Sequence, residues 1–203
     1  MTNHSSLWDA GANPLERAQN NAQLEISQWR ELAETLMKSQ SWRECVGACK
    51  SLLQLDPKHH FAQETLATAL LQLGEQSQAL EAVERLLKLS PRDPLHRLRY
   101  ATLLQMEGRY GESLRQFERV VAMYPDAPFT PDARDAIETL DRLQTSQILL
   151  MASENFDFRW KLERDHRETL HDAGFALSEN GLDILRQMVP PVEDDLEDTP
   201  PMH

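Results

Sequence analysis

The stretch of sequence that decides the fold contains three regularly spaced prolines. Residues 55–125 read LDPKHHFAQETLATALLQLGEQSQALEAVERLLKLSPRDPLHRLRYATLLQMEGRYGESLRQFERVVAMYP, and Pro57, Pro91 and Pro125 stand 34 residues apart, each after an apolar run. A constant interval of this length indicates stacked copies of one supersecondary unit. The residues before Pro57 fit the same register, so the sequence predicts three repeats over about residues 26–128.

Small residues recur at two positions of each repeat. They are Ala33, Ala67 and Ala101 at the first position, and Cys45, Ala79 and Ser113 at the second. Because small side chains allow two helices to approach closely, each repeat is expected to be a helical hairpin. The expected helices are 27–39, 42–55, 61–73, 77–89, 95–107 and 111–123.

Glycine stands where the second and third hairpins must reverse. Gly74 and Gly108 can adopt the left-handed conformation that ends a helix at little cost. Gln40 occupies this place in the first repeat, so a looser first turn is expected. Each proline then ends the second helix, because proline lacks an amide donor and restricts the residue before it.

The pattern resembles the tetratricopeptide repeat family. The resemblance depends on Trp29, Leu32, Ala33, Leu36, Cys45, Cys49 and Pro57, and on the residues 34 and 68 positions later. It implies an all-α fold, a short α-solenoid of three helical hairpins with an N-terminal helix and C-terminal capping helices.

The resemblance also implies a ligand groove, lined by the first helix of each hairpin. Its positions are occupied here by Arg30, Glu34, Met37, Lys38, Phe61, Glu64, Thr68, Leu71, Gln72, Leu95, Leu98, Thr102, Gln105 and Met106, with Arg99 as a cation beside them. Some members of the family bind the C-terminal tails of heat-shock chaperones through a clamp of paired Lys and Asn. Glu34 and Thr68 stand where the asparagines would be, so this clamp is not expected.

The remaining segments are expected to serve the array. Residues 1–25 are predicted to be a disordered start followed by a leader helix, with Asn13 as N-cap before Pro14. Residues 129–152 form an apolar helical stripe that would cap the last repeat. Residues 190–203 are acidic and proline-rich, which is typical of disorder.

Residues 153–189 are predicted to contain a helix from Ser153 to about Asp172 and a short helix after Ser178. The run Phe158, Arg159, Leu162, Asp165, Gly174, Phe175, Leu177 and Ser178 resembles two small helical modules. One is the leader domain of certain ribosomal peptide natural-product precursors, and the other is the small subunit of extradiol ring-cleavage dioxygenases. The alternative is a helical pair that buries Phe158, Leu162 and Leu170 against the capping helix.

Composition and motifs argue against several classes of protein. The net charge of −12 disfavours general nucleic-acid binding, and no window is apolar enough for a membrane span, which favours the cytoplasm. No phosphate loop, Cys-x2-Cys pair or His-Glu-x2-His helix is present, so neither an enzyme, a cofactor nor a metal site is expected. Cys45 and Cys49 fall on core positions of the repeat and are expected to be buried thiols.

The sequence therefore favours a non-catalytic adaptor whose groove binds a helical or extended segment of a protein partner. A secretion-type chaperone and a recognition module of a peptide-modifying or ring-cleavage system are the alternatives. The groove could also be filled by the chain's own helices. Six arginines between Arg92 and Arg119 could dock an acidic segment, including residues 193–198, although such a face is more often simply solvated.

Overall fold

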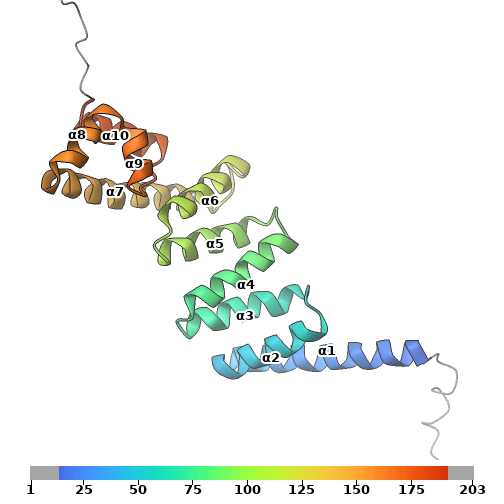
Figure 1. Ribbon diagram of the computed structural model, residues 1–203. Helices are drawn as coiled ribbons and strands as arrows, with labels where there is room; N and C mark the ends of the chain where they lie inside the picture. The colour runs from blue at the N-terminus through green and yellow to red at the C-terminus, as the bar shows by residue number, and fades with distance from the viewer. Residues whose placement is uncertain (1–13, 192–203) are drawn as a thin grey trace, which may run out of the picture. The chain divides into compact units, whose positions relative to one another are not determined.

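The computed structural model describes residues 14–191, with side chains from Gln19 onward. All regular structure in this range is helical, in ten helices labelled α1–α10 (Figure 1), which confirms the predicted fold class. The chain divides into two compact units, Met1–His96 and Arg97–His203. The predictions for residues 1–13 and 192–203 lie outside the described residues.

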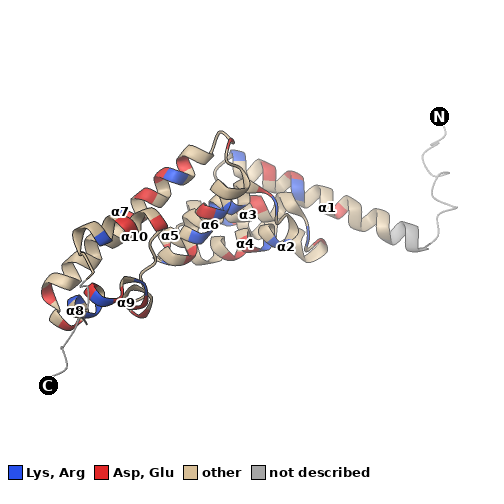
Figure 2. Ribbon diagram, turned by 90° about the horizontal axis from the view of Figure 1, so that it is seen from above, with Lys and Arg blue, Asp and Glu red and all other residues tan. Residues whose placement is uncertain are grey.

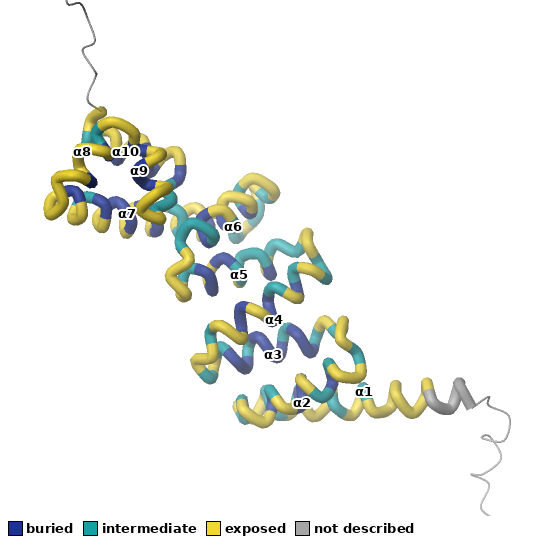
Figure 3. The backbone as a smooth tube through the Cα atoms, viewed as in Figure 1, coloured by how far each residue is buried: buried dark blue, intermediate teal, exposed yellow. Residues whose placement is uncertain are grey.

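The first unit contains two helical hairpins. They are formed by α1 (Pro14–Lys38) with α2 (Trp42–Leu55), and by α3 (His60–Gln72) with α4 (Gln76–Leu89). The leader helix is continuous with the first repeat, an arrangement that the sequence left open. Figure 3 shows that α1 is exposed over residues 19–25, whereas α3 is largely buried. Apart from the start of α1, which lies thirteen residues before the predicted start at residue 27, the repeat helices begin and end within one residue of the predicted bounds.

The small residues lie at the closest contacts inside each hairpin. Cys45 Sγ lies 3.7 Å from the carbonyl oxygen of Ala33, and both residues are fully buried. At the same two positions of the third repeat, Ser113 Oγ donates a hydrogen bond to the carbonyl oxygen of Ala101 at 2.8 Å. A larger side chain at any of these positions would push the paired helices apart.

Gln40 forms the same turn as the two glycines. Its φ of 58° lies in the left-handed region, as do the φ values of 75° at Gly74 and 76° at Gly108. Ser41 N donates to Leu36 O at 3.0 Å, matching the bond from Glu75 N to Leu70 O. The expected looser first turn is therefore wrong, because the hydrogen bonds that close a helix end are complete and Gln40 accepts the backbone strain.

The second unit contains α6 (Tyr110–Met123), α7 (Thr130–Glu154), α8 (Phe156–Arg164), α9 (His166–Asp172) and α10 (Glu179–Met188). The helix α5 (Pro94–Met106) begins in the first unit and continues into the second. The long helix α7 belongs to two hydrophobic clusters. Its first half contributes Ala133 and Leu140 to a cluster with α5 and α6, and its second half contributes Ile148 and Ala152 to a cluster with α8, α9 and α10.

The single helix expected over residues 153–172 is wrong, because the chain forms α8 and α9 there. Asn155 and Asp165 both adopt extended backbone angles and act as N-caps. Their side chains accept hydrogen bonds from Phe158 N and Glu168 N, each at 3.0 Å. These caps start new helices where a continuous apolar pattern suggested none. The expected burial of Phe158, Leu162 and Leu170 is confirmed.

Polar side chains of α7 hold the segment between α9 and α10. Gln144 bonds both the N–H and the carbonyl of Ala176, at 2.9 and 2.7 Å. Buried Asp141 accepts hydrogen bonds from Ser178 N and Ser178 Oγ. A Cβ on Gly181 would lie 2.5 Å from Asp141 Cγ, so α10 can approach α7 only with glycine at this position.

Candidate protein-binding face

One face of α3 remains partly exposed within the first unit. It is formed by Phe61, Glu64, Thr68 and Leu71, which are half-buried and recur at spacings of three and four. Their neighbours on the opposite side of the helix, among them Ala62, Leu66 and Leu70, are buried in the core. We call these four residues the α3 face. It combines two apolar side chains with one carboxylate and one hydroxyl.

The α3 face is joined to α1 by a cation–π contact. The guanidinium of Arg30 lies 5.3 Å from the centroid of the Phe61 ring. Arg30 Nε also pairs with Glu34 Oε1 at 3.1 Å. Met37, two turns further along α1, is half-buried. The structure thus brings together Arg30 and Phe61, two residues that were assigned to the groove.

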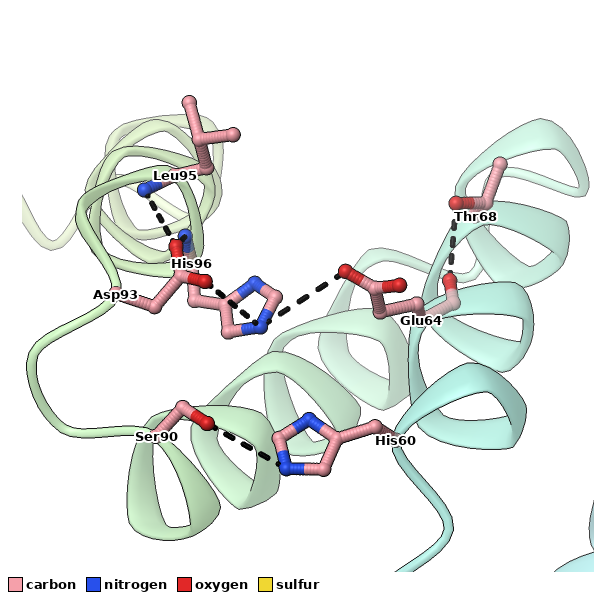
Figure 4. A network of polar contacts seen from close by, with 7 residues as sticks. All are labelled: His60, Glu64, Thr68, Ser90, Asp93, Leu95 and His96. Atoms are coloured by element: carbon pink, nitrogen blue, oxygen red, sulfur yellow. Dashed lines mark hydrogen bonds and ion pairs between the residues drawn. The ribbon is translucent and has the colours of Figure 1, made fainter.

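Glu64 lies beside a buried histidine of the next repeat. His96 Nε2 is 3.8 Å from Glu64 Oε1 and 3.6 Å from Asp93 Oδ2, and the His96 side chain is only 5% exposed. Figure 4 shows the imidazole between the two carboxylates. Asp93 Oδ1 also accepts hydrogen bonds from Leu95 N and His96 N, which fixes the start of α5. Glu64 therefore contacts the next repeat through His96, which Asp93 contacts in turn.

Sequence reasoning missed His96. The His60 ring stacks on that of His96 with centroids 6.5 Å apart, and His60 Nε2 lies 3.4 Å from Ser90 Oγ (Figure 4). His60 and His96 are 36 residues apart, two more than the repeat interval, so their pairing was hidden from a comparison of equivalent positions. His59, in contrast, is the N-cap of α3 and accepts a hydrogen bond from Ala62 N.

The other predicted groove residues lie at or beyond the start of α5. Leu95 is 55% exposed at the start of α5, in the first unit. In the second unit, Arg99, Thr102 and Met106 are exposed, whereas Leu98 is half-buried against the cluster that includes Phe117. Thr102 Oγ1 donates to the carbonyl of Leu98 at 3.0 Å. Leu98 therefore contributes to the core of its own unit.

Four pockets in the described part of the chain are lined by none of the predicted groove residues. One follows the exposed half of α1, another lies between α8 and α9, and two flank the pairing of α7 with α10. The predicted binding residues line none of these hollows.

Burial determines the chemistry of the two cysteines. It raises the pKa of the Cys45 thiol, and it raises the pKa of the Cys49 thiol further, with Cys45 adding to the effect on Cys49. Both remain protonated, weakly reactive thiols at neutral pH. Within residues 14–191 no group of three or more His, Cys, Asp or Glu side chains is arranged to hold a metal ion.

Charges of both signs are interspersed along the helices, as Figure 2 shows for α7. In the arginine-rich segment Arg109 pairs with both oxygens of Glu112 at 2.7 Å, and this hydrogen bonding raises the pKa of Arg109 and lowers that of Glu112. Arg97 donates to Gln116 Oε1 at 2.9 Å. None of the helices in the described part is long and apolar enough to cross a membrane.

Residues 60–103 match the family model of the tetratricopeptide repeat. This part of the chain is similar to a tetratricopeptide repeat. The match spans both helices of the second hairpin and most of the first helix of the third. No curated protein matches the chain.

Solved structures of tetratricopeptide domains share the fold. The TPR domain of Arabidopsis OM64 superposes with a TM-score of 0.51 at 18% identity, covering 60% of this chain and 98% of that one. The yeast Sti1 TPR2B domain, in a complex with Hsp70, gives 0.51 at 14% identity over 59% and 98%. The Yersinia enterocolitica secretion chaperone SycD, bound to a peptide of the translocator YopD, gives 0.51 at 15% identity over 60% and 94%.

Proposed function

We propose that this tetratricopeptide protein is a non-catalytic, cytoplasmic adaptor that binds a helical or extended segment of a partner protein across the first helices of its repeats. The observation that carries the proposal is the α3 face. Phe61 and Leu71 lie half-exposed on a helix whose other side is core, and Arg30 of the preceding repeat stacks on Phe61. Aromatic and arginine side chains at the centre of a surface are frequent anchors of binding energy.

The polar residues of this face favour a partner that offers a cation or N–H donors. The Glu64 side chain is 46% exposed, and its Oε1 lies 3.8 Å from His96 Nε2. Its carboxylate can therefore accept hydrogen bonds from a bound segment. Burial of two or three apolar side chains at roughly 1.5–3 kcal/mol each, less the cost of association, corresponds to micromolar affinity.

Co-purification from native extract tests the proposal, with wild type, Leu71→Glu and Leu55→Glu as parallel baits. Leu55 is 39% exposed at the end of α2 and lies outside the α3 face, so it is the matched control. We expect mass spectrometry to show a stoichiometric protein with wild type and Leu55→Glu that is lost with Leu71→Glu. Equal retention by all three baits would exclude the α3 face. Circular dichroism checks that each variant keeps its helicity.

A synthetic C-terminal Hsp70 peptide tests which kind of segment the protein binds. Such acidic tails suit a clamp of cations and amides, whereas the α3 face presents Glu64 and Thr68, with Glu34 beside Arg30 on α1. We expect no binding by fluorescence anisotropy at peptide concentrations where a clamp-type repeat domain is saturated. Tight binding would show that this chain recognises acidic tails through other residues.

The alternative function is that of a secretion-type chaperone. The fold shared with SycD bound to a translocator peptide is the observation that favours it. A chaperone predicts a client that is soluble only when both chains are co-expressed, whereas an adaptor binds a partner that is already folded. A recognition role for residues 153–189 in a peptide-modifying or ring-cleavage system stays a prediction, and a gene for the matching enzyme beside this one would support it.

A further inference from the structure

An apolar groove runs between α7 and α10 in the second unit. Its volume is about 460 Å³, and Leu149, Ile184 and Met188 form its apolar lining. Ile184 and Met188 are 40% and 57% exposed and stand one turn apart on α10. Asp141 lies against Gly181 at one end of the groove, and Leu149 and Met188 line its other end. The two helices therefore run in the same direction along it.

A second hollow continues from that other end. It has a volume of about 450 Å³, shares Leu149 and Met188 with the groove, and is bounded by Val189, Pro190 and Pro191. The described chain thus ends at the mouth of the groove, and residue 192 begins there.

The exit of the chain is anchored by a buried histidine. His166 Nε2 lies 2.8 Å from the carbonyl oxygen of Val189, and the His166 residue is 5% exposed. Because a carbonyl can only accept, Nε2 carries the proton and donates. The two prolines that follow restrict the backbone further. The backbone is therefore held in place immediately before Pro190 and Pro191.

The next residues have the side chains and the reach to cover the groove. Val192 and Leu196 are apolar and are separated by Glu193, Asp194 and Asp195. Five extended residues span about 16 Å, whereas Ile184 lies only about 6 Å along α10 from Met188. Leu196 can therefore reach Ile184.

Arg142 is the cation available to the acidic residues of this segment; the groove lining also includes Glu138 and Asp141, and Asp141 is buried in hydrogen bonds to Ser178. Arg142 lines the groove from α7, and its guanidinium donates to Thr139 Oγ1 at 3.1 Å. No carboxylate pairs with it in the described part of the chain. Arg142 stands two turns of α7 before Leu149, about 10 Å away, which three or four extended residues can span.

We propose that residues 192–198 of this chain dock into the groove between α7 and α10. Val192 and Leu196 bury Leu149, Ile184 and Met188, and the carboxylates between them face Arg142. Because the segment is tethered at the mouth of the groove, its effective concentration is in the millimolar range. A partner that binds this groove must first displace it.

Oxidation of methionines by dilute hydrogen peroxide, followed by peptide mass spectrometry, tests the proposal. Met188 is compared with Met106 and Met123, which are 51% and 46% exposed and lie outside the groove. In the full chain Met188 is expected to oxidise about fivefold more slowly than in a chain ending at Pro191, as follows if the segment is docked about four-fifths of the time. Met106 and Met123 are expected to react equally in both chains.

Two variants and a dilution series identify the occupant. Leu196→Ser is expected to give the fast Met188 rate of the shortened chain, and Thr199→Ala, outside the docking segment, is expected to keep the slow rate. Equal Met188 rates in the full and shortened chains would overturn the proposal. Protection that disappears on dilution would also overturn it, because a second copy of the chain would then be the occupant.

Discussion

The repeats and the C-terminal helices are held together by different means. Inside the hairpins the closest contacts are made by small residues such as Ala33 and Cys45, which allow close approach of the backbones. Around the second half of α7, single polar side chains bind backbone groups more than 30 residues away, as Asp141 and Gln144 do. The packing of the repeats thus depends on small side-chain volumes at a few positions, whereas the packing of the C-terminal helices depends on particular hydrogen bonds.

The largest effect is expected from adding volume in the repeats. Ala67 is 2% exposed, so Ala67→Trp is expected to lower the free energy of unfolding of the first unit by about 3 kcal/mol. Ala22→Trp, on the exposed half of α1, is the control and is expected to leave stability unchanged. Urea unfolding followed by circular dichroism measures both. A stable Ala67→Trp protein would mean that this contact can relax.

Removing a carboxylate from α7 is expected to have a somewhat smaller effect. Asp141→Ala leaves the N–H and hydroxyl of Ser178 buried without their acceptor, which costs about 2–3 kcal/mol. Glu138→Ala, one turn earlier and exposed, is the control.

Asp141 and Gly181 allow a double-mutant test in urea. Gly181→Ala is expected to destabilise the second unit when Asp141 is present and to cost much less in the Asp141→Ala protein, because the clashing carboxylate is gone. Additive effects would contradict the contact between these two residues.

Alkaline pH is expected to weaken the repeats through their buried thiols. Burial raises the pKa of Cys49 in the folded state, so above the unfolded thiol pKa of about 8.5 the unfolded chain loses its proton first. Above that pH the free energy of unfolding therefore falls as the pH rises, by up to about 1.4 kcal/mol per pH unit for this thiol. Urea titrations at pH 8 and pH 9.5 measure the loss. The Cys49→Ala protein should show a shallower decline, and an identical decline would exclude the thiol as its cause.

Relief of backbone strain in the first turn is the smallest expected effect. Gln40→Gly should raise the free energy of unfolding by about 0.5–1 kcal/mol, because glycine adopts the observed φ of 58° without the cost borne by a Cβ. The converse substitution, Gly74→Ala, should lower stability by about as much. Thermal unfolding compares the two. A lower melting temperature for Gln40→Gly would show that the Gln40 side chain makes a stabilising contact.

The difference between the two regions explains what the sequence could predict. Repeat positions are visible because each is present three times, so Pro57, Pro91 and Pro125 locate the repeat helices to within a residue, except for the start of α1. Asp165 occurs once, in a run whose apolar pattern fits one helix, and only its capping geometry divides α8 from α9. A single residue whose role depends on a distant backbone group does not recur in the sequence, so no repeat pattern reveals it.

The α3 face shows the same limit. Phe61 and Glu64 could be assigned from the repeat register, and the structure places Arg30 on Phe61 as a direct contact. His96 could not be found in this way, because it acts from behind the face and departs from the repeat interval. Residues that line a surface follow the helical period, whereas residues that support them depend on the packing of two helices.

Because α7 contributes to two hydrophobic clusters, it restricts where a further repeat can be added to this chain. Its first half covers the cluster containing Leu114 and Phe117, while its second half supplies Ile148 and Ala152 to another cluster. A fourth repeat inserted after Pro125 would have to present to α7 the same surface that α6 presents now. A repeat duplicated between Pro57 and Pro91 does not have to contact α7. Natural or designed variants that lengthen this chain are therefore expected to add repeats there and to keep the contact between α6 and α7 unchanged.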